Sequence, residues 1–105
     1  MAVDLEAARL IAKAYADDVR RAFPIDKAVL YGSYAYGNAT ELSDIDICFF
    51  LRDFNGKRRV DIIANLFDLS GRYKGVFFEP IAFQTSEIER GNPFIKEILT
   101  TGVEI

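Results

Sequence analysis

The sequence of 105 residues contains no histidine and a single cysteine, Cys48. Without histidine, the chain cannot form a Ser-His-Asp triad, a histidine general base or a zinc site with histidine ligands. Cys48 lies within an apolar run, where a buried, reduced thiol is far more common than a nucleophile or one half of a disulfide. This use of cysteine is typical of a cytosolic protein.

The sequence also lacks a long apolar segment and an excess of basic residues. No run reaches the length of a transmembrane helix, and Met1-Ala2-Val3 is followed at once by Asp4. A net charge of −3 argues against nucleic-acid binding through a general basic field. Half of the residues are hydrophobic and 28% are charged, as in soluble globular proteins. We therefore expect residues 1–105 to form one cytoplasmic domain with no membrane contact.

Hydrophobic periodicity and turn residues predict the order helix, strand, strand, helix, strand, helix. The predicted helices span residues 4–23, 57–73 and 92–101, and the predicted strands span residues 25–31, 45–51 and 76–83. A helical turn at residues 33–36 and a short last strand at 103–105 complete the pattern. Pro80 cannot donate to a ladder, so its strand should lie at a sheet edge or bulge there. This order favours an α/β or α+β domain with a small mixed β-sheet flanked by helices.

Asp44 and Asp46 lie at the start of the apolar run from Ile45 to Leu51. Residues two apart on a strand face the same side, with Cα atoms roughly 6.5–7 Å apart, and two such carboxylates can share Mg²⁺. The alternative is that both are loop residues, one capping a turn and one solvated. Because a carboxylate between Ile45 and Ile47 is costly unless it is paired or metal-bound, the metal interpretation is favoured.

Glu79 interrupts another apolar strand, on the same side as Phe77 and Ile81. A third carboxylate beside the first two is what a two-metal site requires, with ions about 3.5–4 Å apart. The alternative is an edge-strand glutamate that is tolerated because Pro80 makes the strand irregular.

Gly32 and Ser33 follow the apolar run at residues 28–31. If a helical turn begins at Ser33, its free backbone amides form an anion site, Gly32 lets a phosphate approach closely, and Ser33 can donate its hydroxyl. The alternative is only a tight strand-to-helix turn. A glycine-serine pair is weak evidence alone, but it is strong when joined to an Asp-x-Asp and a later strand carboxylate.

Two further groups of residues leave their roles open. Lys57-Arg58-Arg59, the only basic run, is interpreted as a solvated helix end, with contact to a triphosphate or an acidic partner as the alternative. Tyr31, Tyr34 and Tyr36 lie near the predicted site and could pack in the core, stack on a base or present hydroxyls for modification.

Taken together, the motifs resemble those of the nucleotidyltransferases of the DNA polymerase beta superfamily. The matching residues are Gly32-Ser33, Asp44-Ile45-Asp46 after ten intervening residues, and Glu79 on a later strand. The short length is similar to that of the minimal nucleotidyltransferases, the MNT proteins often paired with HEPN partners as antitoxins. Members of this group often carry Arg or Lys where this chain has Tyr36, and Asp where it has Glu79.

The resemblance implies a nucleotidyltransferase fold and a Mg²⁺-dependent transfer of a nucleoside monophosphate, AMP from ATP, with pyrophosphate leaving. It implies that Asp44, Asp46 and Glu79 bind two Mg²⁺ ions and act in catalysis, and that Gly32 and Ser33 bind the nucleotide. Such ions would stabilise charge on the attacking and leaving oxygens.

The resemblance also implies a partner. A minimal enzyme of this kind is expected to transfer AMP to a tyrosine hydroxyl of a HEPN-type toxin, to act as its antitoxin and to assemble as a homo- or hetero-oligomer. One alternative is a non-catalytic antitoxin that neutralises its partner by binding and keeps a vestigial nucleotide site. Another is an enzyme that modifies a small hydroxylated molecule such as an aminoglycoside antibiotic.

Overall fold

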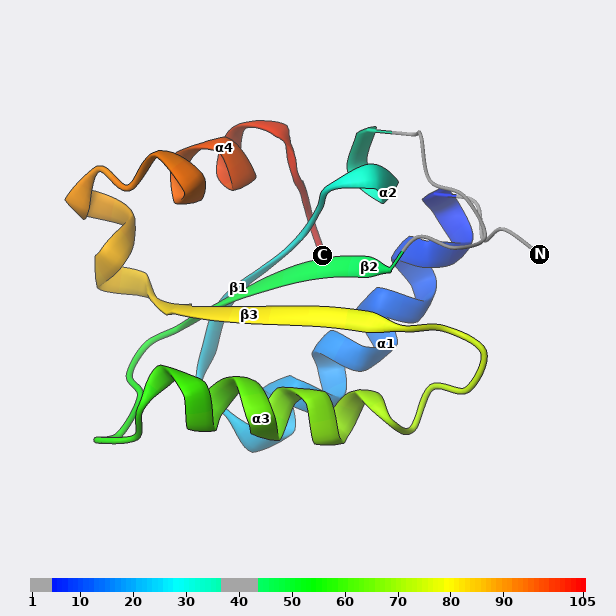
Figure 1. Cartoon of the computed structure of the whole chain (residues 1–105), viewed down its shortest axis with the longest axis horizontal. Helices are drawn as coiled ribbons and strands as arrows, with labels where there is room; N and C mark the ends of the chain where they lie inside the picture. Colours follow the sequence, from blue (N-terminus) through cyan, green and yellow to red (C-terminus); the bar gives the residue numbers. More distant parts are fainter. Residues whose placement is uncertain (1–4, 37–43) are drawn as a thin grey trace.

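The computed structural model describes residues 5–36 and 44–105. One four-stranded sheet has helices on both of its faces (Figure 1). The elements in chain order are α1 (Leu5–Ala22), β1 (Ile25–Tyr31), α2 (Ser33–Tyr36), β2 (Ile45–Leu51), α3 (Arg59–Ser70), β3 (Phe78–Gln84), the 3₁₀-helix η1 (Thr85–Arg90), α4 (Pro93–Thr101) and β4 (Val103–Glu104).

The sheet is mixed, with the strand order β3-β2-β1-β4. β1 runs antiparallel to both β2 and β4, while β2 and β3 are parallel and are connected through α3. The predicted α/β architecture, a small mixed sheet flanked by helices, is therefore confirmed. Pro80 lies in β3, which is an edge strand, as its missing amide hydrogen requires.

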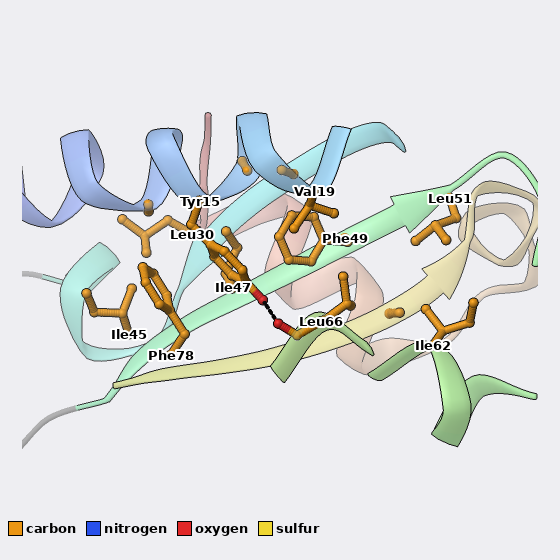
Figure 2. Packing of buried hydrophobic residues seen from close by; sticks show 14 of the residues in the cluster. Tyr15, Val19, Leu30, Ile45, Ile47, Phe49, Leu51, Ile62, Leu66 and Phe78 are labelled. Carbon is orange, nitrogen blue, oxygen red and sulfur yellow. Dashed lines mark hydrogen bonds between the residues drawn. The ribbon is translucent and has the colours of Figure 1, made fainter. Parts of the chain in front are cut away.

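The main core lies between the sheet and the layer formed by α1 and α3 (Figures 1 and 2). Tyr15 of α1 is fully buried there, and its ring packs on Phe49 and Phe78 at centroid distances of 5.6 and 4.4 Å. Its hydroxyl donates a hydrogen bond of 2.6 Å to the backbone carbonyl of Leu66, drawn as a dashed line in Figure 2. A buried tyrosine needs such a partner, so this bond fixes α1 against α3.

A second, smaller core occupies the opposite face of the sheet, under α4. It contains five buried residues, Val29, Cys48, Phe50, Ile95 and Ile98. α4 begins as the sequence predicts: Pro93 is its first residue, and the Asn92 side chain accepts a hydrogen bond of 2.9 Å from the Phe94 amide. Cys48 is a free, buried thiol, as expected.

Other predictions need correction. α3 is shorter than the predicted 57–73, because the backbone of Arg58 is extended and Gly71 caps the end. The helix was expected to be well buried, yet Val60 and Phe67 are exposed and the buried stripe is Ile62 and Leu66. Since α3 packs against the edge strand β3, the sheet covers only one side of it.

β3 begins at Phe78, not at residue 76, and the preceding Phe77 is 77% exposed. η1 was not predicted. The N-cap proposed for Asp4 and the helix break at 37–38 lie outside the described residues. No helix among the described residues is both long and apolar enough to cross a membrane.

Candidate functional site

Two of the predicted site residues, Asp46 and Glu79, share one row across the sheet with Tyr31, whose role the sequence left open. Tyr31 of β1 is paired with Asp46 of β2, and Asp46 is paired with Glu79 of β3. Neighbouring strands lie about 4.8 Å apart, so the two carboxylates start from adjacent backbone positions. Because Asp46 alternates with Cys48 and Phe50, which belong to the core under α4, the row lies on the α4 side of the sheet.

The Asp46 carboxyl is half-buried beside two other acids. Its pKa is raised to about 6, most of all by burial and also by a side-chain hydrogen bond with Glu79 and by the charges of Glu79 and Asp44. Two carboxylates in this arrangement favour binding a proton or a cation between them, because like charges at short range disfavour double ionisation. The site is thus built to attract positive charge.

Gly32 brings the backbone directly against this carboxylate. Its φ of +74° lies in the left-handed region that favours glycine, and a Cβ added here would overlap the carboxylate of Asp46. Ser33 follows as the first residue of α2, and the Ala35 amide closes that turn on the Gly32 carbonyl at 3.0 Å. The tight turn after β1 therefore places the Gly32-Ser33 segment at the acidic row.

Asp44 stands apart from the paired acids. It is exposed and precedes β2, which begins at Ile45, so the strand-spacing argument applies to Asp46 and not to Asp44. The negative charge of Asp44 still acts on the site, because this charge helps to raise the pKa of Asp46. The structure brings Asp46 and Glu79 together and leaves Asp44 at the margin.

The oxygen donors of Asp46 and Glu79 match the ligands that Mg²⁺ prefers. Among residues 5–36 and 44–105, however, no three or more Asp, Glu, His or Cys side chains lie close enough to hold a metal ion. A half-buried carboxyl with a raised pKa, next to a second carboxyl, fits a shared cation. The described side chains thus supply two of the three expected ligands as a pair.

Tyr31 and Tyr34, whose roles the sequence left open, lie in different environments. Tyr31 belongs to the row, and burial together with the charges of Asp46, Cys48 and Glu79 raises its pKa. Tyr34 is buried in the core beneath α1. For Tyr36, the side chain lies outside what the structure describes.

The basic run lies at the far end of the sheet from the row. Arg59 donates to both oxygens of Glu87, at 2.6 and 2.5 Å, and to the backbone carbonyl of Ala82 at 3.0 Å. Its guanidinium also covers the ring of Phe83, 5.3 Å from the centroid. Arg59 is therefore a structural anchor of η1, a role that the interpretation as a solvated helix end missed.

A small cavity adjoins the row. It has a volume of about 170 Å³ and lies between Tyr31 and Gly32 on one side and Phe94, Glu97, Ile98 and Thr101 of α4 on the other. Sequence reasoning did not single out these α4 residues, although their spacing of three and four places them on one helix face. A larger cavity of about 450 Å³, between α1 and β4, includes none of the predicted site residues.

Comparisons with known proteins identify the family and the fold. Residues 12–100 match the model of the nucleotidyltransferase domain family. The fold is similar to the crystal structure of a candidate nucleotidyltransferase from Sulfolobus solfataricus, with a TM-score of 0.61 and 23% sequence identity over 90% of this chain and 75% of that one. No curated protein matches the sequence. Because the family model covers most of the sequence, the chain belongs to the nucleotidyltransferase domain family.

Proposed function

We propose that the protein transfers AMP from ATP to a hydroxyl of a partner protein, a tyrosine of a HEPN-type toxin, and thereby acts as an antitoxin. Nucleotidyl transfer from a nucleoside triphosphate is the chemistry of the family. The observation that carries the assignment to this site is the pairing of Asp46 with Glu79 across β2 and β3, with Gly32 packed against Asp46.

Asp46 and Glu79 would hold a divalent cation, and Asp44 would add charge and a further oxygen donor from the margin. When bound, such cations stabilise the charge that develops on the attacking and leaving oxygens of a phosphoryl transfer. Gly32 lets the carboxylate of Asp46 lie directly against the backbone, and the hydroxyl of Ser33, the next residue, would donate to a phosphate. Tyr31, whose hydroxyl is protonated at neutral pH like that of any tyrosine, would donate to the carboxylates.

In the transfer, the acceptor oxygen forms a bond to the α-phosphorus and the bond to the pyrophosphate oxygen breaks. The acceptor hydroxyl loses its proton, and in this proposal the carboxylate of Glu79 would take it. Glu79 and Asp44 are exposed, so a hydroxyl carried by a second macromolecule can reach them. This exposure suits a protein acceptor. The choice of tyrosine and of a HEPN partner rests on the resemblance of the motifs.

The test is to incubate the protein with a cognate HEPN-type partner and Mg-ATP and to measure the intact mass of the partner. We expect a gain that corresponds to AMP and maps to a tyrosine hydroxyl. Asp46→Asn should abolish the gain and leave the complex intact, because the substitution is nearly isosteric.

A second candidate, a non-catalytic antitoxin, is favoured by the lack of a three-carboxylate group among the described residues. It predicts no added mass and full neutralisation of the toxin by the Asp46→Asn protein at equal stoichiometry. That outcome would refute transfer to the partner. An AMP adduct on a small hydroxylated acceptor instead of the partner would favour an antibiotic-modifying enzyme.

A further inference from the structure

The cavity beside the acidic row joins two parts of the chain that are far apart in sequence. Tyr31 and Gly32 form the side that it shares with the candidate site, and α4 forms the other side. In Figure 1, α4 lies on the opposite side of the sheet from α3. A ligand in this cavity would thus lie next to whatever occupies the Gly32-Ser33 segment.

The α4 side of the cavity presents an aromatic surface. Phe94 is 46% exposed, and its ring meets the edges of Tyr31 and Phe83 at centroid distances of 6.0 and 6.4 Å. Below it, Ile98 is buried and the Asn92 cap fixes the start of the helix. The exposed ring is therefore held in place and needs little ordering when a planar group stacks on it.

The polar group on this side is the carboxylate of Glu97. It is exposed and makes no hydrogen bond or ion pair with any of the described residues. The Thr101 hydroxyl donates to the backbone carbonyl of Glu97 at 2.8 Å, so it too belongs to this helix face. An ionised carboxylate only accepts hydrogen bonds, so it selects a ligand with amino or hydroxyl donors and repels phosphate.

An aromatic platform beside an acceptor fits the base and ribose of a nucleoside, and the negative charge of Glu97 directs the phosphates away, toward Gly32. The volume of about 170 Å³ is below the roughly 300–1,000 Å³ of sites that enclose whole drug-sized ligands. It can therefore take one part of a nucleotide and leave the triphosphate outside.

We propose that this cavity binds the nucleoside part of the nucleotide, with the base stacked on Phe94 and a donor group of the base or ribose bound to Glu97. The inference rests on the proposed function, because it places the nucleoside next to a triphosphate held at Gly32, Asp46 and Glu79. It adds a specificity site on α4 that the motifs of the sequence do not include.

The test compares Mg-ATP with Mg-tripolyphosphate, which lacks the nucleoside, by titration calorimetry. Wild type should bind Mg-ATP more tightly. Phe94→Leu should weaken Mg-ATP by roughly thirtyfold, the middle of the range for base–aromatic stacking, and leave tripolyphosphate unchanged. Phe94→Tyr, which keeps the ring, should retain the ATP affinity. Phe67→Leu is the matched control, because Phe67 is 47% exposed and lies on α3, on the other side of the sheet.

Glu97→Gln provides an independent measurement at an exposed position, where folding is not at risk. It should weaken Mg-ATP and tighten Mg-tripolyphosphate, because it replaces the acceptor and removes a repelling charge. Equal affinity of wild type for both probes, or an unchanged preference for ATP in both Phe94→Leu and Glu97→Gln, would overturn the inference and leave the proposed function standing. Binding of neither probe would overturn both.

Discussion

Replacing Asp46 by Asn should stabilise the protein when no cation or nucleotide is bound. The carboxyl of Asp46 is half-buried beside Glu79, and its pKa is raised from 3.8 to about 6. A group whose pKa is higher in the folded state binds its proton more tightly there. Its contribution to stability is therefore fully present below pH 3.8 and is lost as the pH rises toward 6. At neutral pH the ionised carboxyl destabilises the fold, and Asn removes that charge.

The raised pKa sets the size of the effect. A change from 3.8 to about 6 corresponds to about 3 kcal/mol, at 1.36 kcal/mol for each tenfold change in proton affinity. Solvent screens a half-buried carboxyl, so this is an upper limit. One kcal/mol moves the Tm of a domain of this size by roughly 4–8 °C, so a gain of several degrees is expected.

The assay is thermal unfolding of wild type and Asp46→Asn in metal-free buffer between pH 4 and pH 8. The variant should melt higher at pH 7.5, and the difference should shrink as the pH falls through 6 toward 4. Asp68→Asn, at an exposed position of α3, controls for the loss of one negative charge. Mg-ATP should then raise the Tm of wild type more than that of Asp46→Asn. A variant that melts lower than wild type at pH 7.5, or a difference independent of pH, would refute the reasoning.

Two other substitutions test the site. Glu79→Gln should keep the fold, because Glu79 is exposed, but slow nucleotide transfer at least tenfold, about 1.4 kcal/mol in barrier, in a single-turnover assay; retained activity would make Glu79 an ordinary edge residue. Gly32→Ala should lower both the Tm and Mg-ATP binding, because its Cβ overlaps Asp46, while Gly75→Ala is a control at a position that also has a positive φ but open space around it. If both alanine variants lost Tm and Mg-ATP binding equally, backbone strain alone would explain the losses and the overlap with Asp46 would not.

Much of the fold could be predicted because local signals agree with one another. The bounds predicted for the strands at residues 25–31 and 45–51 are those observed for β1 and β2. Each is an apolar run that ends at a residue with a clear stopping role, Gly32 in one case and Arg52 in the other. Asn92 and Pro93 marked the start of α4 for an equally local reason.

The face of α3 and the position of Phe77 could not be predicted in this way. α3 carries apolar residues on two adjoining stripes, and only packing against β3 decides that Ile62 and Leu66 are buried while Phe67 is exposed. Arg59 shows the same limit, since its bonds to Glu87 and Ala82 join residues more than twenty positions away in sequence. Such long-range pairings are set by the assembled sheet.

The candidate site, like the fold, could be predicted only in part. Asp46 and Glu79 were recognisable because carboxylates are rare in apolar strands without a partner. Their common row with Tyr31 depends on the register of three strands, which a single sequence does not specify. The cavity at α4 depends in addition on how the last helix packs on β1, so neither Phe94 nor Glu97 carried a signal of its own.

The two ends of the sheet differ in how their charged side chains are paired. At the Leu51 end, opposite charges and donors meet: Arg59 binds Glu87, and Asp26 accepts a hydrogen bond of 2.6 Å from Thr85. At the other end, Asp46 and Glu79 are placed together with no basic side chain among the causes that shift the pKa of Asp46. A fold selected for stability alone would place a cationic side chain there. Leaving the position without such a partner costs stability, and under the proposed function that cost is what would let a cation and a nucleotide bind there instead.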